Sequence, residues 1–328
     1  MDTRTLLLAA AAEGPHLRAV VEAAREGLFA DLPAPRSVVL VTGEARARLA
    51  AEAVVALADD ARAPVVVCGA LPPFAGALDL VVVLTDDPGD AACAAALVEA
   101  ARRGCATVLI DPGEGPVRAA CDPSTVVAPR PAMADRGSFC GYLGAAFAAL
   151  TGAGVTGLGP AAVLSDVADA VDAEAMVFAP DRDQLVNPAR ELGHWMRGRS
   201  MVFGGLGERW RTVAELSAAW MLDAGVPAHG TALPDFGRAL RALTPGERDI
   251  FHDPDFDGPV ADPLVLPLGA IIVTSPADHD TAAARLGHLP WVRVEAPALE
   301  VELRHPLVDV CVTAVRMAAA AAYVVEED

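Results

Sequence analysis

The chain has 328 residues and carries 44 acidic against 25 basic side chains, a net charge of 25 − 44 = −19. All 25 basic residues are arginine, which excludes a Schiff-base lysine, a P-loop lysine and any lysine acting as acid or base. This acidity argues against nucleic acids and anionic membranes as partners, because phosphate groups are bound by basic surfaces.

The start of the chain does not predict a signal peptide, and its end does not predict a membrane span. The apolar run Leu6–Ala12 has no basic cluster before it, and Cys311–Val325 is interrupted by Arg316 and falls short of the about 20 residues that a spanning helix needs. The six cysteines form no CxxC pair and follow no regular spacing. We therefore expect a cytoplasmic protein with reduced thiols and no metal site built on its cysteines. We also expect no cofactor.

In the first half of the chain, short apolar runs alternate with alanine-rich helical stretches. Strands are predicted at Ser37–Val41, Pro64–Cys68, Leu78–Leu84, Ala106–Ile110 and Thr125–Ala128, and helices at Glu44–Asp59 and Asp90–Arg103. The strand runs are rich in Val and Leu and lack polar alternation, which is typical of strands covered on both faces. The pattern predicts a parallel sheet between two layers of helices.

The second half repeats this pattern after a helical bridge. Bridge helices are predicted at Phe139–Leu150 and Pro160–Asp172, on either side of the glycine-rich stretch Thr151–Gly159. Further helices are predicted at 187–197, Glu208–Asp223, Thr281–Gly287 and Pro306–Val325, strands at Met201–Phe203, Ala270–Thr274 and Trp291–Glu295, and a loop at Pro259–Pro267. We expect two α/β domains, residues 1–155 and 187–328, joined by a helical linker at 156–186.

Two loops are candidate ligand sites, because open parallel sheets bind ligands at the carboxyl ends of their strands. Thr42 and Gly43 follow the first strand of the first half, and Gly205 and Gly207 precede Arg209 in the second. A glycine-rich turn at a helix N-terminus exposes backbone N–H groups to an anion, and an arginine adds a charged donor. The alternative is a tight strand-to-helix turn with solvated arginines. The spacing of the dinucleotide-binding motif is not met.

Three segments resemble a known family. They are Asn187–Thr212, with Asn-Pro-Ala-Arg-Glu-Leu, a strand, a glycine-rich loop and Arg-Trp-Arg-Thr, then Leu233-Pro234-Asp235, and Pro129-Arg130-Pro131-Ala132. Together they resemble the bifunctional phosphoglucose/phosphomannose isomerases, in the shorter, diverged form found in high-GC actinobacteria. The resemblance implies two tandem sugar isomerase (SIS) domains, each a parallel sheet with helices on both faces. It also implies a homodimer, for which Val310–Val324 is a candidate interface; the alternative is that this alanine-rich helix packs inside one chain.

The resemblance further implies an aldose–ketose isomerase acting on glucose 6-phosphate or mannose 6-phosphate. In that family a Glu moves a proton between C1 and C2, and Glu215 is the best match here. A His opens the sugar ring. The family's own position carries no histidine in this sequence, so His229 is the candidate, with His252 and His305 as weaker alternatives. The candidate substrate contacts come from the two loops and from the resemblance; they are Thr42, Gly43, Arg130, Gly205, Gly207 and Arg209.

The phosphate-binding loops depart from the family pattern. Ala45 stands where the family has a serine, and Asp86, Asp87 and Asp90 stand where hydroxyls would donate to phosphate. Ionised carboxylates cannot donate hydrogen bonds, and they repel a phosphate. The departures favour an alternative, a catalytically inactive sugar-phosphate sensor or partner-binding protein, and leave open a purely structural dimer. The three aspartates are either an ordinary acidic loop or a divalent-cation site.

Overall fold

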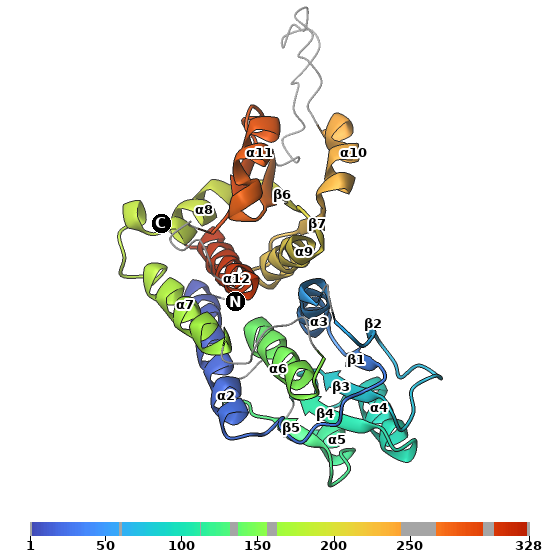
Figure 1. Ribbon diagram of the computed structural model, residues 1–328. Coiled ribbons are helices and arrows are strands. Elements are labelled where there is room, and N and C mark those ends of the chain that lie inside the picture. Colours follow the sequence, from blue (N-terminus) through green and yellow to red (C-terminus); the bar gives the residue numbers. More distant parts are fainter. Residues whose placement is uncertain are drawn as a thin grey trace, which may run out of the picture.

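The computed structural model describes residues 2–58, 61–111, 113–131, 137–155, 163–243, 267–297 and 305–326, which form two parallel sheets flanked by helices (Figure 1). The first sheet has the strand order β2-β1-β3-β4-β5. Its strands are β1 (Val38–Thr42), β2 (Val65–Cys68), β3 (Leu80–Leu84), β4 (Ala106–Ile110) and β5 (Val126–Ala128). Adjacent strands are parallel, so their carboxyl ends share one edge.

Alternate residues of β1 send their side chains to two helical layers, as the two-residue period of a strand requires. Val38 and Leu40 pack with α2, α3 and α6, whereas Val39 and Val41 pack with α4 and α5. The helices of this half and the bridge are α1 (Thr3–Ala11), α2 (Glu13–Arg25), α3 (Ala45–Leu57), α4 (Ala91–Arg102), α5 (Gly115–Ala119), α6 (Phe139–Gly152) and α7 (Val163–Val177). The sheet is therefore covered on both faces, as its apolar strands predict.

The second sheet has the strand order β7-β6-β8-β9 and is also parallel. Its strands are β6 (Ser200–Gly205), β7 (Ala228–Ala232), β8 (Leu268–Val273) and β9 (Val292–Glu295). Its helices are α8 (Pro188–Met196), α9 (Glu208–Asp223), α10 (Leu233–Leu243), α11 (Pro276–Leu286) and α12 (Pro306–Val324), with a 3-10 turn at Gln184–Val186. Ile271 packs in the same cluster as α9 and α12, and Ile272 packs with α10 and α11 on the other face.

Helix α12 lies between the two halves and packs against α1, α7, α8 and α9 (Figure 1). By length and composition it could cross a membrane, but 89% of its most apolar window is buried inside the protein. Arg316 in its middle forms an ion pair with Glu174 of α7 at 2.6 Å. The expectation that this helix supplies a dimer interface is wrong, because the chain's own helices cover it.

Most predicted elements of the described residues are confirmed, with shifts at their ends. Asn187 caps α8 by accepting from the Arg190 N–H at 2.9 Å, as its position before Pro188 suggests. Strand β7 is not predicted, because its sequence Ala-His-Gly-Thr-Ala contains no apolar run. The predicted loop Pro259–Pro267, except for its last residue, and the first residues of the predicted helix 160–172 lie outside the described residues. The sheets fall within 1–155 and 187–328, while the domain boundaries themselves stay a prediction.

Candidate functional site

The loops after β1 and β3 meet at the carboxyl edge of the first sheet, where the candidate contacts Thr42 and Gly43 lie. Thr42 is buried at the end of β1, and the Gly43 N–H donates to the Leu84 carbonyl at 2.9 Å. A Cβ at Gly43 would lie 2.4 Å from Asp90 Oδ2 and 2.5 Å from Thr85 Oγ1. The two loops therefore touch, and glycine permits this close approach.

The acidic side chains of the β3 loop accept hydrogen bonds from nearby backbone N–H groups. Asp90 Oδ1 accepts from the N–H of Cys93, at the start of α4, at 2.9 Å. Asp86 Oδ2 accepts from the N–H of Gly137 at 3.0 Å, and Asp87 caps a turn within its own loop. A bound phosphate would need such donors, and here the chain's own carboxylates occupy them.

Arg130, a candidate phosphate contact, lies just after β5 and forms an ion pair with Asp111, Nη1 to Oδ1, at 2.9 Å. Asp111 is buried and has a φ of 57°, a left-handed conformation that non-glycine residues adopt at a cost of about 1 kcal/mol or more. Burial raises the pKa of the Asp111 carboxyl, against the opposing effect of Arg130, and Asp86 raises it further. Both side chains line a hollow of about 20 Å³ at this edge.

The turn between β6 and α9 contains the candidate contacts Gly205, Gly207 and Arg209. A Cβ at Gly205 would lie 2.2 Å from the backbone of Trp210, and Gly207 has a φ of 84°. Close packing of the turn thus requires a glycine at position 205, and the left-handed backbone conformation favours a glycine at position 207. Both are explained by the strand-to-helix turn, the alternative to an anion site.

Glu215, the candidate base, belongs to a ring of four charges between α3 and α9. Its Oε2 atom lies 3.3 Å from Arg48 Nη2, and its Oε1 atom pairs with Arg211. Glu52 closes the ring, with 2.7 Å to Arg48 and 2.9 Å to Arg211. Glu215 therefore has an arginine on each oxygen, and it connects a helix of the first half to one of the second.

His229, the candidate ring-opening residue, is exposed on the edge strand β7. Its neighbour Gly230 packs against α9, where a Cβ would lie 2.4 Å from the Cα of Glu215. Because successive strand residues point to opposite faces, His229 points away from Glu215. Among the alternatives, His305 caps α12 by accepting from a backbone N–H at 3.2 Å, and His252 lies outside the described residues. Among the described residues, the structure does not bring the candidate base Glu215 and His229 together.

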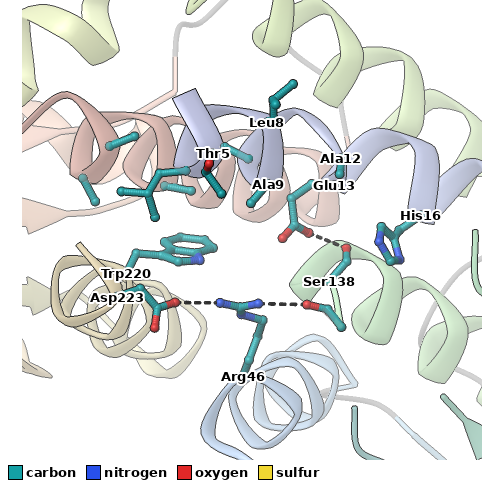
Figure 2. A pocket seen from close by; sticks show the side chains of 16 residues that line it. Thr5, Leu8, Ala9, Ala12, Glu13, His16, Arg46, Ser138, Trp220 and Asp223 are labelled. Atoms are coloured by element: carbon teal, nitrogen blue, oxygen red, sulfur yellow. Dashed lines mark hydrogen bonds and ion pairs between the residues drawn. The ribbon is translucent and has the colours of Figure 1, made fainter. Parts of the chain in front are cut away.

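A cavity of about 560 Å³ lies between the halves, where α1, α2, α3, α6, α9 and α12 meet (Figure 2). Its apolar wall consists of leucine and alanine side chains of α1 and α12 together with Trp220 of α9. Its polar lining comprises Glu13, His16, Arg46, Ser138 and Asp223. An apolar wall with a few convergent polar groups is the usual character of a small-molecule site.

Two side chains organise the polar part of this cavity (Figure 2). Arg46 of α3 donates to the Gly137 carbonyl at 2.9 Å and pairs with Asp223 of α9 at 3.0 Å. Glu13, buried at the start of α2, accepts from the Ser138 hydroxyl at 2.5 Å and from a backbone N–H of α6 at 2.7 Å. The cavity wall is thus held by contacts between residues far apart in the sequence.

His16 lies one turn after Glu13 and lines both the cavity and the 20 Å³ hollow. Burial lowers the pKa of His16 below its ordinary value of 6.5, Glu13 opposes this shift, and Arg130 and Arg46 reinforce it. At neutral pH the ring is therefore a neutral imidazole, which donates one hydrogen bond and accepts another. It is the described histidine best placed to contact a ligand in the cavity.

Within the described ranges, no group of three or more His, Cys, Asp or Glu side chains is arranged to hold a metal ion, and this includes the loop with Asp86, Asp87 and Asp90. All six cysteines lie in the described residues and are free thiols. The residues that line the 560 Å³ cavity offer hydrogen bonds, charge and an apolar wall to a small ligand.

Sequence reasoning missed the residues that line the cavity. Glu13 and His16 lie on a helix near the N-terminus that the apolar pattern does not identify, and Trp220 and Asp223 lie near the end of α9. Ser138 alone carries a local signal, because a serine before an apolar helical run is a typical N-cap. The other side chains come together only through tertiary packing.

Comparison with known proteins gives the fold. No family model and no curated protein matches this sequence. Tagatose-6-phosphate ketose/aldose isomerase from Escherichia coli superimposes with a TM-score of 0.67 at 14% identity, over 98% of this chain and 91% of that one. The C-terminal domain of glucosamine-fructose-6-phosphate aminotransferase from Francisella tularensis superimposes with a TM-score of 0.62 at 10% identity, over 98% of this chain and 95% of that one. The chain therefore has a sugar isomerase (SIS)-type fold, as its sequence suggests.

Proposed function

We propose that the protein binds a carbohydrate derivative in the 560 Å³ cavity and does not use Glu215 to interconvert aldoses and ketoses. The observation that carries this proposal is the pairing of both Glu215 oxygens with Arg48 and Arg211, while His229 faces away. A general base must reach the proton that it removes, and its pKa must suit the transfer. Two flanking arginines hold both oxygens of Glu215 and fix the position of its side chain.

The cavity itself supports carbohydrate binding. A sugar ring has a polar rim of hydroxyl groups and apolar C–H faces, and the cavity offers partners for both. Trp220 and the alanine-rich wall suit the apolar faces, while His16 and Arg46 suit the hydroxyls. Two solved structures with this fold are named for proteins that act on sugar phosphates, which agrees with the proposal.

Ligand binding and turnover, measured together on the full chain, test the proposal. Thermal unfolding is followed with glucose 6-phosphate, mannose 6-phosphate and fructose 6-phosphate, and with the unphosphorylated sugars. We expect at least one sugar derivative to raise Tm, and we expect no fructose 6-phosphate to form from the two aldose phosphates. Absence of stabilisation by every compound, or measurable turnover, would contradict the proposal.

An isomerase of the bifunctional phosphoglucose/phosphomannose type is the second candidate, and the shared fold with a ketose/aldose isomerase favours it. In this version Glu215 is the base and His229 opens the ring. The phosphate is held by Thr42, Gly43, Arg130, Gly205, Gly207 and Arg209. Turnover that disappears in Glu215→Gln would establish this candidate.

The Glu215→Gln variant also has a structural consequence. The variant loses one ion pair to Arg48 of α3 and one to Arg211 within α9, which should lower the free energy of unfolding by about 1–2 kcal/mol because the ring of charges is only partly exposed. Glu208→Gln is a matched control, since Glu208 pairs with Arg211 from a largely exposed position and should cost less. Urea unfolding of both variants measures the difference.

The homodimer also stays a proposal. Since α12 is covered within one chain, a dimer would use another surface. The mass of the protein in solution tests this: the monomer mass would exclude pairing.

A further inference from the structure

The connection between the parallel strands β2 and β3 is a coil, residues 69–79, where such connections usually contain a helix (Figure 1). Leu71 and Ala75 of this coil pack in the same cluster as Val39 of β1 and the inner side of α4. Val66 of the edge strand β2 lies beside Val39 in register and therefore on the same face of the sheet, yet its side chain is 38% exposed. The coil thus covers this face at β1 and leaves it open at β2.

Two segments on this side of the first half carry no charge, although the chain as a whole has a net charge of −19. The sequence has no acidic or basic residue at 63–78, which includes β2 and most of the coil, or at 91–98, the larger part of α4. Edge strands are usually protected by charged side chains, and β2 has none.

Large apolar side chains are exposed in both uncharged segments. They are Val66 of β2, Phe74 and Leu78 of the coil and Val98 of α4, each between 38% and 69% exposed, and we call them the β2–α4 surface. Exposed apolar side chains that gather in one region typically mark a binding surface for another macromolecule.

The coil is held in a fixed shape and joined to α4. Arg103, the residue after α4, donates through Nη1 to three backbone carbonyl groups of the coil at 2.9–3.2 Å. Arg36 donates to the Phe74 carbonyl at 3.2 Å and pairs with the buried Asp79, which also accepts from the Gly76 N–H at 2.9 Å. A surface whose backbone is already ordered loses little conformational entropy when it binds.

Charged side chains lie at the border of this surface. Arg36 is paired with Asp79, and Arg102 at the end of α4 is paired with Glu99. An apolar centre within a polar border is the usual anatomy of an interface between proteins.

We propose that the β2–α4 surface is the contact between two copies of this chain related by a two-fold axis. It assigns a surface to the homodimer proposed above, and carbohydrate binding does not depend on it. A two-fold contact places the same patch of both copies together, so an uncharged apolar centre meets its equal. Two chains of charge −19 repel each other, and an uncharged surface is where they can approach. A partner of opposite charge would be recognised by charged groups, which the centre of this surface lacks.

The mass of the full-length protein in solution, measured by sedimentation over a range of protein and NaCl concentrations, is the first test. We expect twice the monomer mass, and we expect the dimer Kd to fall as NaCl is raised, because salt screens the repulsion between two acidic chains. The monomer mass at every concentration, or association that weakens with salt, would overturn the proposal.

Variants locate the contact. Phe74→Asp and Val98→Asp each place a carboxylate in the apolar centre of both copies, and each should raise the dimer Kd at least about tenfold. Leu185→Asp is the matched control, because it makes the same kind of change at a side chain that is 93% exposed outside this surface, and it should leave Kd unchanged. All three side chains are more than half exposed, so the variants should keep the circular dichroism spectrum of the natural protein.

The outcomes separate this surface from the other proposals. A dimer whose Kd is the same in Phe74→Asp and Val98→Asp as in the natural protein overturns the β2–α4 surface and leaves the homodimer in place. The monomer mass throughout overturns both. None of the four side chains of the surface lines the 560 Å³ cavity, so a failure to bind carbohydrate would leave the dimer contact standing.

Discussion

At Gly230 the edge strand β7 touches the backbone of α9. A Cβ there would lie 2.4 Å from the Cα of Glu215 and 2.6 Å from the Ala214 carbonyl oxygen, and backbone atoms do not yield as a flexible side chain does. Gly230→Ala should therefore lower the free energy of unfolding by about 1–3 kcal/mol.

Gly237 of α10 provides the matched control for this change. No atom lies within 4 Å of the Cβ position at Gly237, so Gly237→Ala should stabilise the helix by up to about 1 kcal/mol. Urea unfolding measures both variants, and effects of the same sign would contradict the packing of β7 on α9.

His16 makes stability depend on pH. Its pKa is lowered by burial, so below its ordinary value of 6.5 the unfolded chain binds a proton that the folded chain does not. Stability is fully present above pH 6.5 and is lost as pH falls from there toward the lowered pKa of the folded state. Tm should fall as the pH is lowered from about 7 to 5.5.

The variant His16→Gln should show a smaller loss of Tm over the same range. Burial also lowers the pKa of His305, so part of the dependence should remain. Differential scanning calorimetry at several pH values measures the slope. A slope as steep in the variant as in the natural sequence would show that His16 does not carry the effect.

At the scale of elements, Glu13 of α2 determines how α6 begins. Its carboxylate accepts from the Ser138 hydroxyl and from two backbone N–H groups of α6. Glu13→Gln replaces one accepting oxygen with an NH₂ group that faces donors, and should cost about 1.5–3 kcal/mol of stability. Glu22→Gln, an exposed change on the same helix, should have little effect in the same unfolding measurement. Equal effects would show that Glu13 does not hold α6.

The elements differ in how far the sequence determines them. The buried strands β1, β3 and β4 follow from their uninterrupted Val, Leu and Ile runs, and α9 has the predicted bounds Glu208–Asp223. Strand β7 is an edge strand that exists because it pairs with β6, and its composition alone gives no strand signal. The local sequence pattern therefore predicts the central strands and the long helices, whereas an edge strand such as β7 depends on pairing with its neighbour.

The site is less predictable than the fold, because its contacts join residues distant in the sequence. Glu215 resembles a catalytic base by register, but its partner Arg48 lies 167 residues away on another helix. Arg46 likewise meets Asp223 across 177 residues. The sequence does show that the loop after β3 is acidic at Asp86 and Asp90, and the structure adds which backbone donors those carboxylates occupy.

At the scale of the whole molecule, the two halves share one apolar core. A single cluster contains Leu40 of the first sheet, Phe203 of the second and the buried face of α12. The cavity lies beside this core, and its walls come from both halves of the chain (Figure 2). A ligand bound there would touch helices from both halves, which is why the cavity is the centre of the proposed function.

Calorimetric titration of the natural protein and of the Ala9→Phe variant tests most directly whether the cavity binds a carbohydrate derivative. Ala9 lines the cavity from an exposed position of α1, so a phenyl ring fills the space without disturbing the core. We predict that a carbohydrate derivative binds the natural protein and that Ala9→Phe abolishes the binding while Tm stays the same. Equal binding by both proteins, or no binding by the natural protein, would contradict the account.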